Sequence, residues 1–313
     1  MIDRKRCLPS GRWLDRGFMS LSVLCAWLPL VVMAGFFLQL LVSSLPVWRE
    51  FGLSFIWSTE WDPVANHYGA FNALAGTVVT TVIALGIAIP FAFVTAFYLV
   101  DARPGIAAVL SQAIDLLAAI PSIIFGMWGL FILVPIMQNY VMPFLVETLG
   151  LGQLPFVGEY YNGFGFLTAG LILALMILPY ICAVMRDVFK MVPNVLRESA
   201  YGIGCTKWET ACDIVMRYGA RGLLGGIFIG LGRALGETMA VLFVIGNIQQ
   251  MPDSLFSCGT TIAATLANNF AEADGMMRAA LFGMGLLLLL LSLAVQIGAQ
   301  YYLVALGRKM GKR

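Results

Sequence analysis

Six long runs of apolar residues constrain this chain more than any other feature. A helix needs about 20 residues to cross the hydrocarbon core of a bilayer, and each run reaches that length. In chain order, the predicted spans are Phe18–Leu45, Phe71–Val100, Gln112–Met137, Phe166–Val188, Gly222–Ile248 and Ala279–Leu306. Only a helix satisfies its own backbone hydrogen bonds in lipid. The sequence therefore predicts an all-α integral membrane protein with six transmembrane helices.

The amino-acid composition supports a membrane location. Of the 313 residues, 60% are hydrophobic and 12% are charged, whereas soluble domains carry about 25% charged residues. The first apolar run follows a basic N-terminal segment, as a signal peptide would. It is too long for a signal sequence and lacks an A-x-A cleavage site, so we expect a retained anchor.

The positions of lysine and arginine predict the orientation. Nearly all of the 19 basic residues fall in the N-terminal segment, in the connections after the second and fourth spans, and in the C-terminal tail. The opposite loops carry only Arg49 and Arg278. Because loops rich in lysine and arginine stay inside, both termini and the loop after the fourth span are predicted to be cytoplasmic.

The fifth span carries an unusual pair of charges. Gly222, Gly226, Gly230, Arg233 and Glu237 would fall within an arc of about 80° on a helix. Glycines at this spacing let helices approach closely, so we expect the two charged residues to face a helix seam or a water-filled path. An arginine inside a membrane costs roughly 2.5 kcal/mol or more.

Glu237 is expected to partner Arg233, since it lies one helical turn further on. One interpretation is that the two charges only neutralise each other and hold the helix in register. However, an acid preceding a base is the better order for such a pair, and here the base comes first. We therefore favour a functional role, because ionisable residues inside membranes mark transport paths.

A second carboxylate lies near the cytosolic end of the third span. Asp115 begins the sequence DLLAAIPS, which ends at Ser122. A functional role for Asp115 and a carboxylate wetted at the membrane interface are equally compatible with the sequence. Pro121 is expected to break this helix.

The loop after the fourth span contains helix-start and helix-stop signals. Pro193 suits a first helical position, and Gly202 and Gly204 suit a helix end. Thr206 and Glu209 form a predicted capping box for the next helix. The pattern predicts two short helices joined at a glycine elbow, which an ordinary hairpin between two spans would also explain.

Several kinds of chemistry leave no trace in the sequence. There is no G-x-x-x-x-G-K-[ST] phosphate loop, so we expect the chain not to hydrolyse nucleotides and not to be an enzyme. The six cysteines include no C-x-x-C pair, and we expect no metal and no cofactor. The net charge of +2 gives no reason to expect nucleic acid as a partner. Between the fifth and sixth spans, the external loop is expected to contain a short amphipathic helix.

The cytosolic loop resembles a known docking motif. Residues 198–217 follow the EAA-x3-G-x9-I-x-L-P pattern of ABC importer permeases. Met216 and Arg217 stand in place of the leucine and the proline. In that family the loop docks on the ATPase subunit. The resemblance implies docking roles for Glu198, Ser199, Ala200, Gly204, Trp208 and Ile214.

Three further blocks resemble the permeases of phosphate-specific ABC importers. They are GLGRALGETMAV at 230–241, DLLAAIPS at 115–122 and, less closely, ATLANNFAEA at 264–273. The GETMAV form is similar to the PstC type of the two sister permeases. We predict a substrate path that contains Arg233, Glu237, Thr238, Asp115 and Ser122.

The resemblance implies a type I (MetI-like) importer in a bacterial inner membrane. Expected partners are a second, homologous permease, two cytosolic ATPase subunits that bind the ATP, a periplasmic phosphate-binding protein and phosphate itself. The resemblance also allows a phosphate-signalling regulator. The predicted organisation is a cytoplasmic tail at 1–17, a first helix with an external segment at 18–70, a permease core at 71–306 with a cytosolic coupling loop at 190–221, and a tail at 307–313.

Other functions remain open at this point. The cargo could be phosphonate, sulfate or molybdate, or the chain could be the sister phosphate permease. A stand-alone secondary anion carrier would explain Arg233 and Glu237 but would leave the cytosolic elbow without a purpose. A membrane scaffold that signals phosphate status through partners is a further, non-transport alternative.

Overall fold

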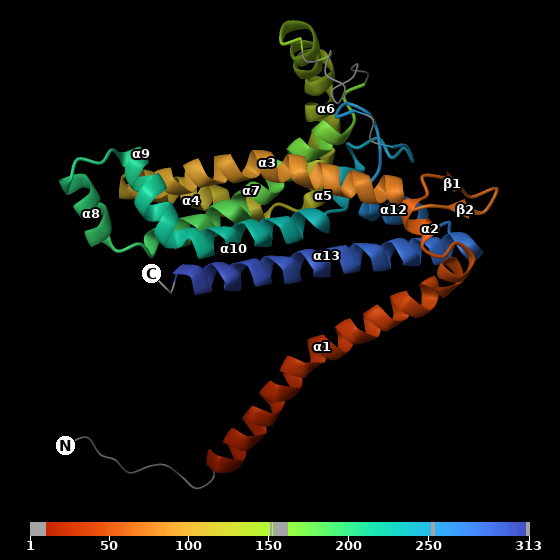
Figure 1. The fold of residues 1–313 in the computed structure, drawn as a ribbon, viewed down its shortest axis with the longest axis horizontal. Helices are drawn as coiled ribbons and strands as arrows, with labels where there is room; N and C mark the ends of the chain where they lie inside the picture. Colours follow the sequence, from red (N-terminus) through yellow and green to blue (C-terminus); the bar gives the residue numbers. More distant parts are fainter. Residues whose placement is uncertain (1–10, 151, 153–161, 252–253, 311–313) are drawn as a thin grey trace.

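Six membrane-length helices dominate the computed structural model, which describes residues 11–150, 152, 162–251 and 254–310 (Figure 1). The helical stretches that are long and apolar enough to span a bilayer are Leu14–Glu50, Phe71–Asp101, Ser122–Thr148, Phe166–Lys190, Lys207–Leu235 and Gly275–Ala305. The predicted number of spans and the helical fold class are thus confirmed. The first helix begins at Gly11, before the predicted Phe18.

The helices differ widely in length. The longer helices are α1 (Gly11–Glu50), α3 (Phe71–Asp101), α4 (Pro104–Ala119), α7 (Phe166–Lys190), α10 (Met216–Leu235) and α13 (Gly275–Met310). The shorter helices are α2 (Ser54–Trp57), α5 (Ser122–Trp128), α6 (Val134–Ile136), α8 (Asn194–Gly202), α9 (Lys207–Glu209), α11 (Met239–Leu242) and α12 (Ile262–Asn269). Wider π-helical turns are η1 (Gly129–Leu133), η2 (Met137–Val141), η3 (Phe144–Thr148) and η5 (Thr210–Val215). The strands β1 (Trp61–Asp62) and β2 (His67–Tyr68) form one antiparallel hairpin.

Helices α3, α7, α10 and α13 lie side by side and form the body of the molecule (Figure 1). Helices α8 and α9 lie at one end of this bundle, which we call the α8 end. The β1–β2 hairpin, α2 and α12 lie at the other, which we call the hairpin end. The predicted docking loop and the external segment after the first helix thus lie at opposite ends of the membrane helices.

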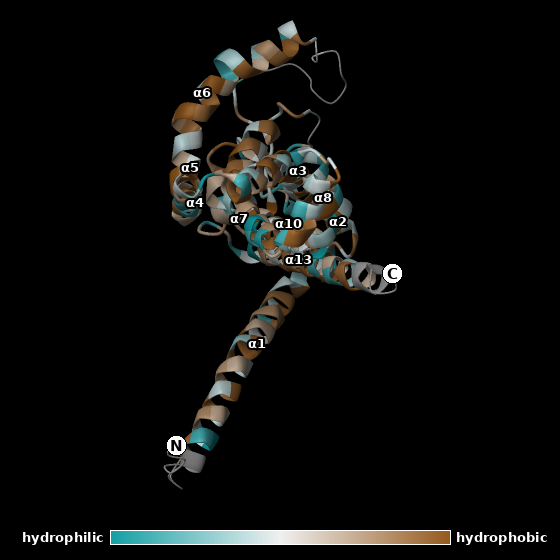
Figure 2. Cartoon of the chain, turned by 90° about the vertical axis from the view of Figure 1, so that its left-hand side faces the viewer, coloured by the Kyte–Doolittle hydropathy of each residue, from teal (hydrophilic) through white to brown (hydrophobic). Residues whose placement is uncertain are grey.

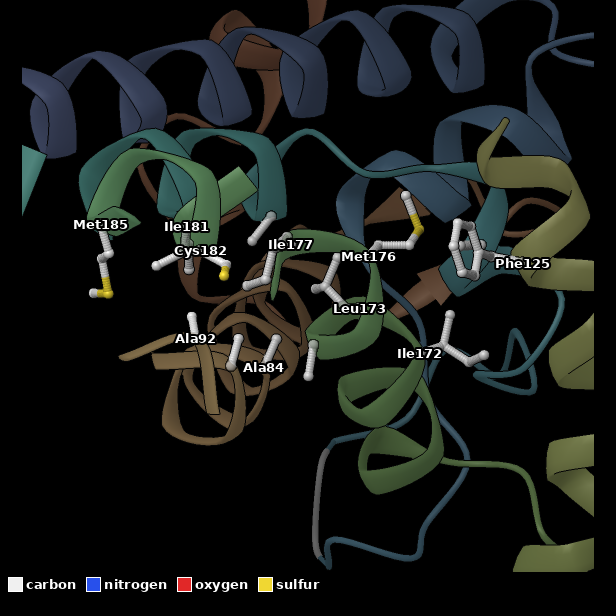
Figure 3. Close-up of a cluster of buried hydrophobic side chains, with 14 of the residues drawn as sticks. Ala84, Ala92, Phe125, Ile172, Leu173, Met176, Ile177, Ile181, Cys182 and Met185 are labelled. Carbon is white, nitrogen blue, oxygen red and sulfur yellow. The ribbon is translucent and has the colours of Figure 1, made fainter. Parts of the chain in front are cut away.

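The core is centred on the contact between α3 and α7. Ala84, Ala88, Ala92 and Ala96 recur every four residues along α3, and all four are fully buried. They pack in the same cluster as large apolar residues of α7, among them Ile177 and Ile181 (Figure 3). Small side chains at this spacing let two helix backbones approach closely in a membrane.

The glycine stripe of the fifth span packs against α7, as predicted. A Cβ atom on Gly226 would lie 3.0 Å from Val184, and one on Gly230 would lie 2.6 Å from Ile181. Gly222 abuts Val188 in the same way. The seam therefore leaves no room for side chains on this face of α10.

The predicted third span, Gln112–Met137, is wrong in its bounds. Helix α4 ends at Ala119, and the membrane-length stretch begins only at Ser122. Ile120 takes an extended conformation with ψ of 128°, as a residue before proline prefers, so the expected break at Pro121 is confirmed. The following loop was also predicted to start too early, because π-helical turns continue to Thr148.

The predicted fifth span, Gly222–Ile248, is wrong at both ends. Elements α9, η5 and α10 form one uninterrupted helical stretch from Lys207 to Leu235. The predicted second docking helix is therefore the start of this span and not a separate short helix. The helix ends at Leu235 with Gly236 as the cap residue, and only the short α11 follows.

Two segments extend away from the bundle (Figures 1 and 2). Helix α1 contacts α13 near the hairpin end, where Leu40, Ser44 and Val47 are buried. Its earlier residues, such as Phe18 and Trp27, are exposed although they are apolar. The stretch from α5 to η3 rises from the opposite side of the bundle. Both segments offer apolar surface that this chain itself does not cover.

The glycine seam makes a direct prediction about stability. We expect Gly222→Leu to lower the thermal unfolding midpoint of the detergent-solubilised protein, because the new side chain must displace Val188 from the α7 contact. Overpacking of this kind costs about 1–3 kcal/mol. Gly225→Leu is the matched control, since no atom lies within 4 Å of a Cβ at that position. Equal midpoints for the two variants would contradict the seam.

Candidate functional site

Arg233 lies near the end of α10 and faces the middle of α7. Its guanidinium carbon is 4.5 Å from the centroid of the Tyr180 ring. At the helical rise, Tyr180 is about 21 Å along α7 from Phe166 and about 15 Å from Lys190. The arginine is therefore held deep within the span. Its predicted orientation into a helix seam is confirmed.

No carboxylate of the described residues neutralises Arg233. None of the ion pairs among the described residues includes it, and its buried Nε atom has no hydrogen-bond partner. The expected pairing with Glu237 is wrong, because the helix ends at Leu235 and Glu237 is not one helical turn further on. Instead, the Glu237 carboxylate accepts a hydrogen bond from the Ala240 amide at 3.3 Å.

The ring of Tyr180 gives Arg233 a partner that carries no charge. A cation–π contact contributes about 0.5–2 kcal/mol, which offsets part of the cost of placing an arginine in a membrane. An ion pair would neutralise the positive charge, whereas contact with an aromatic face leaves the charge available to an anion. The planar guanidinium then presents hydrogen-bond donors in the fork that suits oxyanions.

Tyr180 belongs to none of the sequence motifs from which the site was predicted. A tyrosine in the middle of an apolar span is itself a signal, since a buried hydroxyl requires a hydrogen-bond partner. The Tyr180 hydroxyl donates to the backbone oxygen of Ala118 on α4, at 2.7 Å. Pairing that residue with Arg233 required the packing of α7 on α10, which the sequence does not give.

Ser122 and Thr238 each lie where a helix is interrupted. Ser122 is the first residue of α5. Thr238 is in the turn between α10 and α11, with its hydroxyl 3.5 Å from the Gly236 oxygen. The two regions meet, because a Cβ on Gly126 of α5 would lie 3.0 Å from the Met239 oxygen. None of the hydrogen bonds among the described residues joins Ser122 or Thr238 to Arg233.

Asp115 belongs to a separate cluster closer to the α8 end. Its carboxylate is 3.7 Å from the Arg186 guanidinium, and Arg186 also lies 3.5 Å from Asp187. The Arg186 side chain is only 13% exposed, whereas that of Asp115 is 56% exposed. The structure therefore brings Asp115 to Arg186 on α7, and not to Arg233.

The predicted docking residues gather at the α8 end. Glu198 and Ser199 are exposed on α8, and Ala200 is buried beneath them. Gly204 has a φ of +94°, which a side chain would strain, so the expected glycine elbow is confirmed. The capping box is confirmed as well, because the Glu209 carboxylate accepts a hydrogen bond from the Thr206 amide at 2.7 Å.

Exposed apolar side chains surround this elbow. Ile203 is 84% exposed, Val195 69% and Trp208 62%, while Ile214 is half-buried further along the same stretch. Scattered apolar residues on a surface need no explanation, but a group around charged docking candidates indicates a contact with another protein.

Ionic contacts fix the elbow to the bundle. Asp101, at the end of α3, lies 3.7 Å from Arg197 on α8 and 3.3 Å from Lys207 on α9. Arg197 also donates to the backbone oxygen of Phe189 on α7 at 2.6 Å. Because Arg197 is 12% exposed and Asp101 23% exposed, this pair is more than a solvated surface contact. In the sequence, Arg197 is only one of the basic residues whose positions predict the orientation of the protein in the membrane.

A single continuous helical stretch joins the two regions. It begins at Lys207 beside the elbow and ends at Leu235, just after Arg233. At the helical rise, Lys207 and Arg233 are about 39 Å apart along this stretch. The elbow therefore adjoins the same helical stretch that carries the arginine.

Comparisons with known proteins identify the family of this chain. The model of the family described as "Binding-protein-dependent transport system inner membrane component" matches residues 88–303. The chain is 42% identical to the phosphate transport system permease protein PstC of Haemophilus influenzae, with all of both chains covered. It is 44% identical to the protein of the same name from Xylella fastidiosa (strain 9a5c), over 99% of this chain and 98% of the relative.

A solved structure shows the same fold. It is a chain of a bacterial alginate ABC transporter in complex with an alginate-bound periplasmic protein, with a TM-score of 0.61 and 14% identity over 93% of this chain and 94% of that chain. At that identity the likeness concerns the fold alone. The family match and the full-length relatives lead to one conclusion: the chain belongs to the binding-protein-dependent transport system inner membrane components and, within them, to the PstC-type permeases.

Proposed function

We propose that this chain is a transmembrane permease subunit of an ATP-driven importer for inorganic phosphate. Relatives named as phosphate transport permeases match it over its full length. The observation on the chain's own residues that carries the proposal is the unneutralised guanidinium of Arg233 near the middle of the membrane span. Arginine binds phosphate oxygens through paired, charge-assisted hydrogen bonds.

The α8 end faces the cytosol in this proposal, and the hairpin end faces the periplasm. The distribution of basic residues supports this orientation in a bacterial inner membrane, with both termini in the cytoplasm. Phosphate then enters at the hairpin end, passes Arg233 and leaves toward the α8 end.

The chain works as part of a larger assembly. A second, homologous permease completes the translocation path, and the uncovered apolar surfaces of α1 and of the stretch from α5 to η3 are available for it. Two cytosolic ATPase subunits bind the ATP, and this chain needs no cofactor of its own. A periplasmic binding protein delivers phosphate at the hairpin end.

Glu237 and the docking elbow complete the mechanism. Glu237 is half-buried beyond the end of α10, and its carboxylate is an acceptor for the proton that hydrogen phosphate carries and sulfate lacks. When the ATPases close, the elbow around Gly204 moves, and the continuous helix from Lys207 to Leu235 transmits that motion to Arg233.

Replacing the arginine tests the proposed substrate contact. We expect Arg233→Gln to reduce ATP-dependent phosphate uptake by at least about tenfold, because charge-assisted hydrogen bonds contribute about 1.5–3 kcal/mol. Uptake of labelled phosphate into proteoliposomes that contain the whole importer measures this loss, and copurification of the subunits shows that assembly persists.

Arg217→Gln is the matched control for this experiment. Arg217 lies on the same helical stretch, is exposed and pairs with Asp213 at 3.0 Å, so its loss should leave uptake close to that of the unaltered protein. Normal uptake by the Arg233→Gln variant would reject the proposed substrate role.

A second substitution tests the docking surface. We expect Ile203→Asp to reduce copurification of the ATPase subunits several-fold, because it places a charge in the centre of the exposed apolar group. Val64→Asp is the control, since Val64 is 93% exposed at the hairpin end. Equal recovery of the ATPase with both variants would show that the elbow is not the docking surface.

A further inference from the structure

Tyr180 makes two contacts that join three helices at the level of Arg233. Its ring lies beneath the Arg233 guanidinium of α10 at 4.5 Å. Its hydroxyl donates to the Ala118 oxygen at 2.7 Å. Ala118 is in the last turn of α4, which ends at Ala119. Backbone oxygens in the last turn of a helix lack partners within the helix, so the tyrosine satisfies one of them.

The hydroxyl contact anchors the far end of the ring. The hydroxyl oxygen lies on the axis of the second side-chain torsion, so its hydrogen bond to the neighbouring helix restrains the first torsion. The tip of the side chain is thereby held at α4, while the face of the ring meets Arg233 on α10.

A neutral support matters because of what Arg233 lacks. Its Nε atom is buried without a partner, and no carboxylate of the described residues lies within ion-pair distance. A guanidinium without any support would turn toward water or toward an acid. The ring holds the group in place while leaving its donors and its charge free for an anion.

We propose that Tyr180 is a positioning residue for anion transport, which presents Arg233 to the passing phosphate through the electron-rich face of its ring. This inference rests on the proposed function, because it assumes that Arg233 binds the cargo. The ring supplies the contact, and the hydroxyl anchors the tip of the side chain on α4.

Substitutions at position 180 separate the role of the ring from the role of the hydroxyl. Tyr180→Phe keeps the ring and loses the hydroxyl, whereas Tyr180→Leu loses the ring. A third variant carries 3,4,5-trifluorophenylalanine at position 180, which keeps the shape of phenylalanine but withdraws electron density from the ring face. Only an electrostatic role of the ring distinguishes the fluorinated side chain from phenylalanine.

The measured quantity is the number of phosphate ions imported per ATP hydrolysed, in proteoliposomes with the whole importer and saturating phosphate-loaded binding protein. A defect in folding or assembly lowers uptake and ATP hydrolysis together and leaves this ratio unchanged. A mispositioned Arg233 lowers uptake while hydrolysis continues. The ratio therefore reports on the cargo contact.

We expect the ratio to fall about fivefold or more for Tyr180→Leu, within the roughly 2- to 30-fold range that a cation–π contact supplies. Tyr180→Phe should stay within about twofold of the unaltered protein, and the trifluorophenylalanine variant should fall toward the leucine variant. An unchanged ratio for Tyr180→Leu, or equal ratios for phenylalanine and trifluorophenylalanine, would overturn the proposal.

Arg233→Gln in the same assay distinguishes the two proposals. If that variant loses uptake while the Tyr180 variants keep their ratio, the positioning role fails and the proposed function stands. If Arg233→Gln imports phosphate normally, the substrate role of Arg233 fails and the positioning role of Tyr180 fails with it. If the unaltered importer takes up no phosphate, the proposed function itself fails.

Discussion

The contact between the Arg233 guanidinium and the neutral ring of Tyr180 holds a positive charge inside the helix bundle. Arg233 sits within a membrane span at a cost that few other residues incur, and the described residues supply Tyr180 instead of an acid. An arginine neutralised by a carboxylate would be a packing feature of the helix. An arginine supported by an aromatic face retains its charge, and this retained charge is the property that an anion permease requires.

The helix packing explains how such a contact is maintained. Buried alanines of α3 and the glycine stripe of α10 allow both helices to approach α7 closely, which brings Arg233 of α10 to Tyr180 of α7. The helical stretch from Lys207 to Leu235 begins beside the elbow at Gly204 and carries the arginine near its other end. In the proposed mechanism, motion of the elbow reaches the arginine through this continuous stretch.

The sequence predicted the elements that follow from local rules. Six spans, the break at Pro121, the glycine elbow and the capping box at Thr206 each depend on hydrophobic length or on backbone chemistry within a few residues. The glycine stripe of α10 was predicted for the same reason, since helical periodicity places its members on one face.

The features that the sequence did not predict depend on tertiary contacts or on the exact residue at which a helix ends. The pairing of Arg233 with Glu237 was wrong because an apolar run was taken as one helix, although Gly236 ends it. The contact with Tyr180 and the ionic anchor at Asp101 join residues far apart in the chain, and no periodicity reveals them. Whether the predicted substrate-path residues contact cargo stays a prediction.

The most direct measurement is an experimental structure of the assembled importer, trapped with phosphate in the membrane path. The account predicts a phosphate oxygen about 3 Å from the Arg233 guanidinium, with the Tyr180 ring still within about 6 Å on its other face. A carboxylate from either permease bound to that guanidinium, or an Arg233 side chain turned toward lipid headgroups, would contradict it.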